Sequence, residues 1–138
     1  MRNHTAVLIA VLALAIPALA LAANPKLPAT FSGGGGGAPV MFKLEKHGKA
    51  TSASFAFSCK NVNGIGVAKT DSKHKPSGKV SKGKITITYL AKGGGTVGTV
   101  KATVKATFTT KTHAKGTASI SGGNCKSPPK VKFTVDAA

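Results

Sequence analysis

The stretch TVGTVKATVKATFTT, residues 96–110, decides the fold class because apolar and polar side chains alternate along it. A period of two is the pattern of a β-strand that buries one face and exposes the other. Gly98 shifts the phase of this alternation, and we expect a β-bulge there. Lysines and threonines fall on the exposed face, and the buried face carries Val100, Ala102, Val104, Ala106 and Phe108.

The same alternation recurs in shorter runs on both sides of this stretch, separated by turns rich in Gly, Asn, Asp and Ser. Apart from the N-terminus, no run has a helical period. Because each run has one apolar face, two antiparallel sheets should pack face to face. The sequence therefore predicts an all-β antiparallel β-sandwich of seven to eight short strands, Ig-like or jelly-roll in connectivity. The other predicted strands lie in PVMFKLEK (39–46), ATSASFAFSC (50–59), IGV (65–67), KITITYL (84–90), AKGTASIS (114–121) and KVKFTV (130–135).

The N-terminus is typical of a secretory signal peptide. Arg2 precedes an apolar run over residues 6–16, which is followed by Pro17 and by the small-residue triplet at residues 20–22. We expect cleavage after Ala22 and a secreted or cell-envelope-associated product. A membrane anchor is the alternative, since the apolar stretch is about long enough to span a bilayer.

Residues 23–38 contain five consecutive glycines, which favours a flexible segment ahead of the domain at residues 39–138. A second possibility is that Thr30 and Phe31 form a short edge strand, with the glycines as its turn. Both interpretations stay open at the level of the sequence.

The chain has only two cysteines, Cys59 and Cys125. In an exported protein the economical interpretation is a disulfide between them. Closing that loop is worth about 4 kcal/mol in the chain-entropy model. A metal site or a reactive thiol is the alternative, but neither cysteine has a histidine or a second cysteine close by in sequence.

Short motifs resemble those of small secreted bacterial β-sandwich proteins of the actinobacterial type, a largely uncharacterised group. They are TFSG (30–33), HGK (47–49), SFAFSC (54–59), KATFTTKTHAKGTASI (105–120), CKS (125–127) and KVKFTV (130–135). The resemblance covers most of the chain after residue 22. It implies the same fold, secretion and a Cys59–Cys125 pair, and it supplies no catalytic residue.

The sequence offers little for catalysis. There is no G-x-S-x-G motif, and the three acidic residues, Glu45, Asp71 and Asp136, are too few and too scattered for a glycosidase pair. We therefore predict a non-enzymatic protein without catalytic residues, cofactor or metal. A metal site built from three histidines in separate turns is the enzymatic alternative: His47, His74 and His113.

The excess of lysine over acidic residues is the one feature of the sequence that points to a function. The chain has 20 basic residues, all lysine except Arg2, against 3 acids. Such a charge attracts polyanions, with an affinity that falls as salt rises. Lysine lacks the fork with which arginine binds phosphate and guanine, and the phenylalanines fall on apolar faces, which argues against sequence-specific or stacking recognition. The candidate contact residues point outward on or beside strands: Lys84, Lys101, Lys105, Lys130 and Lys132.

The expected partners are anionic cell-envelope polymers, lipid headgroups or extracellular nucleic acid, bound without specificity. The alternative is a structural or protein-interaction module whose lysines serve only solubility and keep strand edges from associating.

Overall fold

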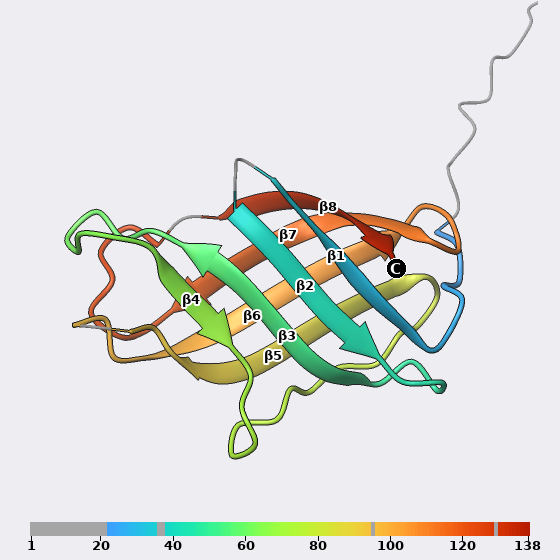
Figure 1. Cartoon of the computed structure of the whole chain (residues 1–138), viewed down its shortest axis with the longest axis horizontal. Helices are drawn as coiled ribbons and strands as arrows, with labels where there is room; N and C mark the ends of the chain where they lie inside the picture. The colour runs from blue at the N-terminus through green and yellow to red at the C-terminus, as the bar shows by residue number, and fades with distance from the viewer. Residues whose placement is uncertain (1–21, 36–37, 95, 129) are drawn as a thin grey trace, which may run out of the picture.

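The computed structural model describes residues 22–35, 38–94, 96–128 and 130–138 (Figure 1). The predicted signal peptide lies outside these residues, except for Ala22. The described chain contains strands and no helix. The strands are β1 (Ala29–Gly35), β2 (Ala38–Leu44), β3 (Ala50–Phe57), β4 (Gly66–Lys69), β5 (Lys84–Lys92), β6 (Thr99–Phe108), β7 (His113–Ser121) and β8 (Val131–Ala137).

The eight strands form one antiparallel sheet in the order β4-β3-β2-β1-β8-β7-β6-β5. This confirms the prediction of an all-β antiparallel fold with seven to eight strands. The connectivity is simpler than the Ig-like or jelly-roll connectivity that we expected, because all strands adjacent in sequence are also paired in the sheet, with the exception of β4 and β5. Alternation predicts which face of a strand is buried, but it does not identify the strand that pairs with it.

The sheet bends so that its two halves face each other, with β1–β4 lying across β5–β8 (Figure 1). The predicted apolar faces meet between these halves. Three rings form the centre of the core: Phe31 lies 5.3 Å from Phe42 and 5.2 Å from Phe108, measured between ring centroids. All three side chains are fully buried. Aromatic pairs at such distances add to the stabilisation that burial provides.

The glycine-rich segment is part of this fold, which corrects the division at residue 39. Strand β1 is central in the sheet and pairs with both β2 and β8. A Cβ on Gly33 or Gly35 would collide with the backbone carbonyl of Thr134 or Lys132. Glycine is therefore required where β1 and β8 join the two halves of the sheet, because only glycine allows this close approach.

The connection between β4 and β5 closes the opposite side of the molecule. Ala50 donates a hydrogen bond to the carbonyl of Gly78 (2.9 Å), and Ser77 and Thr88 exchange two backbone hydrogen bonds (2.9 Å each). The Tyr89 hydroxyl donates to the carbonyl of Ala68 (2.8 Å) and so links β5 to β4 inside the core. These contacts satisfy backbone groups at sheet edges that would otherwise be free to pair with another chain.

A disulfide joins the two halves at one end. Cys59 and Cys125 are bonded (2.07 Å between sulfurs), and there is no free cysteine among the described residues. The predicted bridge is confirmed, and because both sulfurs are bonded neither serves as a metal ligand or a reactive thiol. Asn61 adds two hydrogen bonds between the same two loops, donating to Asn124 (2.9 Å) and accepting from the amide of Lys126 (2.7 Å).

Candidate functional site

The outward side of β5–β8 carries most of the lysines that lie in strands, and we call it the lysine face. The alternation that buries the Ile, Val, Ala and Phe side chains of these strands places their lysines outward. On β1–β4 the only strand lysines are Lys43 and Lys69. The lysine face consists of Lys84, Lys92, Lys101, Lys105, Lys115 and Lys132, and every one of them is exposed.

Four of the five lysines predicted from the sequence lie on this face. The fifth, Lys130, is exposed and immediately precedes β8. Our sequence reasoning missed Lys92 and Lys115. The sequence contained a signal for Lys115, because this lysine lies in the predicted strand at residues 114–121 and alternates with the small residues Ala114 and Gly116.

Strand register spreads these charges in two dimensions. Thr107 lies between Lys84 and Lys115, and Lys105 lies between Thr86 and Thr117 in the next row. Lysines that share a row are therefore two strand spacings apart, roughly 10 Å. No lysine of this face lies directly opposite another, an arrangement that avoids the cost of paired like charges.

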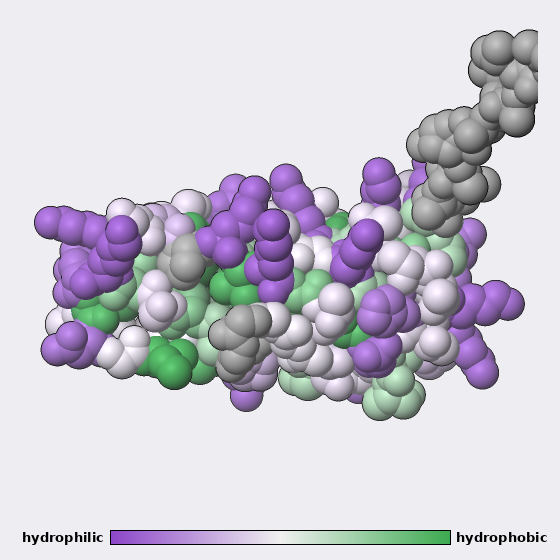
Figure 2. All heavy atoms as spheres, turned by 90° about the horizontal axis from the view of Figure 1, so that it is seen from above, coloured by the Kyte–Doolittle hydropathy of each residue, from purple (hydrophilic) through white to green (hydrophobic). Residues whose placement is uncertain are grey.

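No carboxylate neutralises these lysines. Among the described residues no lysine lies within 4.0 Å of a carboxylate; the salt bridges found there are two histidine–aspartate pairs, with side chains of intermediate to high exposure. His113 Nδ1 lies 2.6 Å from Asp136 Oδ1 where β7 pairs with the end of β8. Figure 2 shows hydrophilic side chains projecting along most of the molecule. Because none of these lysines is paired with a carboxylate among the described residues, the positive field of the lysine face extends into solvent.

Asp71 and His74 interact with each other in the loop that follows β4. Asp71 Oδ1 accepts backbone hydrogen bonds from Lys73 (2.9 Å) and His74 (2.6 Å) and lies 3.1 Å from the His74 ring nitrogen. Hydrogen bonding to His74 lowers the pKa of Asp71 below its ordinary value. The side chain thus stabilises a turn. Within the described part of the chain no three His, Cys, Asp or Glu side chains lie close enough to hold a metal ion.

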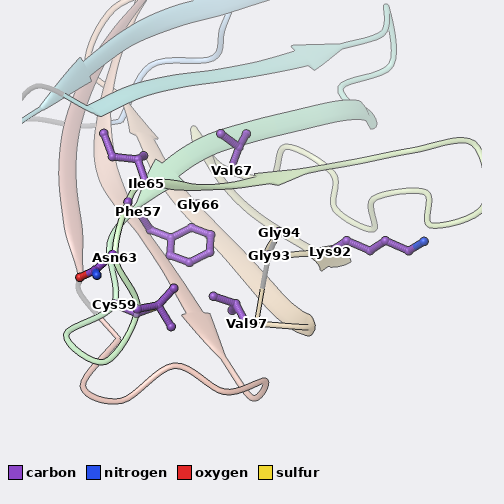
Figure 3. Close-up of a pocket in the computed structure, with 12 residues that line it drawn as sticks. Phe57, Cys59, Asn63, Ile65, Gly66, Val67, Lys92, Gly93, Gly94 and Val97 are labelled. Carbon is purple, nitrogen blue, oxygen red and sulfur yellow. The ribbon is translucent and has the colours of Figure 1, made fainter.

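An apolar hollow of about 260 Å³ lies beside the disulfide, between the start of β4 and the end of β5 (Figure 3). The ring of Phe57 and the side chain of Val97 lie within it, whereas the side chain of Lys92 extends away from it. Ile65, at its edge, is 77% exposed. The predicted strand at 65–67 is thus displaced to residues 66–69, where Ala68 points inward. The described residues that line this hollow include no acid–base pair.

No helix among the residues described is long and apolar enough to cross a membrane. The chain matches no model of a known protein family, no curated protein and no solved structure, so its resemblance to small secreted bacterial β-sandwich proteins stays a prediction.

Proposed function

We propose that this protein is a secreted, non-enzymatic protein that binds anionic polymers or surfaces through its lysine face. The observation that carries the proposal is the distribution of charge. Six strand lysines are exposed on one half of the sheet, and none of them is paired with a carboxylate among the described residues. The disulfide is compatible with an oxidising compartment, in which thiols pair and remain paired.

The chemistry of the face supports a diffuse mode of binding. Lysine ammonium groups are mobile point charges that attract phosphate, sulfate and carboxylate alike. The aromatic residues that could stack on bases or sugars are buried in the core, including Phe31, Phe42 and Phe108. Binding should therefore depend on the charge density of the polymer and on salt, and little on its sequence. Envelope polymers, lipid headgroups and extracellular nucleic acid all have the required charge.

The test compares two variants of equal charge. One replaces four lysines of the face by glutamine: Lys84, Lys105, Lys115 and Lys132. The control replaces four exposed lysines of the other half: Lys43, Lys46, Lys49 and Lys69. Polyphosphate binding is measured over a salt series. Each contact with a charged group contributes to the slope of log K against log salt, so the face variant should lower that slope by roughly three, and the control by less than one.

Equal effects of the two variants would contradict the proposal and favour the alternative, in which the lysines serve only solubility. One observation favours that alternative, a structural or protein-interaction module. Ile65 is 77% exposed and Val67 50%, and a partner protein that covered these side chains would remove apolar surface from water.

A further inference from the structure

We infer that the lysine face contains a defined subsite for one tetrahedral oxyanion, a phosphate or sulfate group carried by the bound polymer. The inference rests on the proposed function and adds a preferred chemical group to it. The subsite is the hollow between Lys84 and Lys105, where the side chains of three strands meet.

The hollow has a volume of about 290 Å³ and spans β5, β6 and β7. Register places its polar side chains in two adjoining rows, with Lys84 opposite Thr107 and with Lys105 between Thr86 and Thr117. Side chains two residues apart on one strand point to the same side, so all five lie around one depression. Both lysines are exposed, whereas Thr107 and Thr117 are half-buried.

Gly116 forms part of this hollow. It pairs with Ala106, and a Cβ at this position would collide with the carbonyl of Lys105. Only glycine therefore lets β7 run this close to the backbone of β6, and this close approach fixes the register that brings the side chains of the hollow together.

The threonine hydroxyls of the hollow are available to a ligand. None of Thr86, Thr107 and Thr117 makes a side-chain hydrogen bond within the described part of the chain. Among the residues that the structure describes, no carboxylate lines the hollow. Three hydroxyl donors and two ammonium groups thus surround a space that attracts negative charge.

The number and direction of these donors favour a tetrahedral anion. A phosphate or sulfate group presents oxygens in several directions and can accept from donors on three strands at once. A carboxylate has two oxygens in one plane and can satisfy fewer of them. The lysines alone attract any polyanion, and the threonine hydroxyls favour phosphate and sulfate groups over carboxylates.

The test removes the hydroxyls and keeps the charge. The variant T86V/T107V/T117V is compared with T88V/T99V/T103V, which alters three threonines of β5 and β6 outside the hollow. Binding of polyphosphate, dextran sulfate and polyglutamate is measured by titration calorimetry at one salt concentration. The first variant should bind polyphosphate, dextran sulfate or both about tenfold more weakly, and polyglutamate unchanged. The control should bind all three like the wild type.

The polymer that loses affinity identifies the source of the oxyanion, phosphate or sulfate. T86S/T107S/T117S retains the hydroxyls and should bind within about twofold of the wild type. An unchanged affinity of the valine variant for both oxyanion polymers, or an equal loss for polyglutamate, overturns the subsite. If the wild type binds none of the three polymers, the proposed function itself fails, which is a distinguishable result.

Discussion

Replacement of both bridged cysteines by alanine should lower the free energy of unfolding by about 4 kcal/mol. The bridge spans a sequence separation of 66 residues, and a loop of this length gives that value in the chain-entropy model. The bridge stabilises the protein mainly by restricting the unfolded chain. In the folded state Asn61 makes two hydrogen bonds between the same two loops, and these remain when the bridge is removed. The native structure should therefore survive in C59A/C125A, with a large fraction of its stability lost.

Urea unfolding measures this loss, and the single tyrosine, Tyr89, is a buried fluorescence probe in a chain without tryptophan. The midpoint should fall, and the m-value should rise because the unfolded chain without its bridge exposes more surface. N61A, which keeps the disulfide and removes the neighbouring hydrogen bonds, serves as the local control. A loss below about 1 kcal/mol in C59A/C125A, or a changed native spectrum, would refute this account of the bridge.

Two further substitutions test the core and the β6–β7 pair. Burial raises the pKa of Tyr89. The folded protein therefore keeps the phenolic proton at a pH where the unfolded chain loses it. The free energy of unfolding consequently falls as the pH rises above about 10. Y89F should be about 1 kcal/mol less stable than the wild type at pH 7, because it loses the hydrogen bond to the Ala68 carbonyl. Urea titrations should show that this difference shrinks towards pH 11. A difference that stays constant with pH would contradict the raised pKa of Tyr89. G116A should lose about 2 kcal/mol or more in thermal unfolding, because its Cβ collides with backbone, and wild-type stability would show that β6 and β7 are less close than described.

The sequence predicted inward and outward side chains well wherever the alternation was long. Val100, Val104 and Phe108 are buried as predicted, and so are Phe55, Phe57 and Cys59. Burial on one face is a local property of a strand, and the sequence pattern records it directly. The same pattern placed Lys101 and Lys105 outward.

The errors concern positions where glycine or an edge breaks the pattern. The glycines of β1 have no side chain to alternate, so the sequence left open whether this segment was a tether or a short edge strand, and the structure shows a central strand that includes Gly33–Gly35. Gly98 makes no bulge; it lies in the turn before β6, at a φ of 75°, and its carbonyl accepts a hydrogen bond from Gly93. The short strand predicted at residues 65–67 lies at residues 66–69, at the edge of the sheet, with Ala68 inward and Val67 outward.

The sequence predicted which lysines point outward, but it did not predict that they gather on one half of the sheet. Each strand showed its own lysines, but their gathering on β5–β8 depends on strand order, which alternation does not determine. The hollow at Lys84 and Lys105 depends on register across three strands, which becomes known only when the pairing is known.

The most direct measurement for the lysine face is a map of backbone amide and lysine ammonium NMR shifts during titration with polyphosphate. We expect the largest changes on β5–β8, strongest at Lys84, Lys105 and Lys115, and their disappearance at high salt. Changes of equal size at Lys43 and Lys69, or confined to β1–β4, would contradict the assignment of binding to this face.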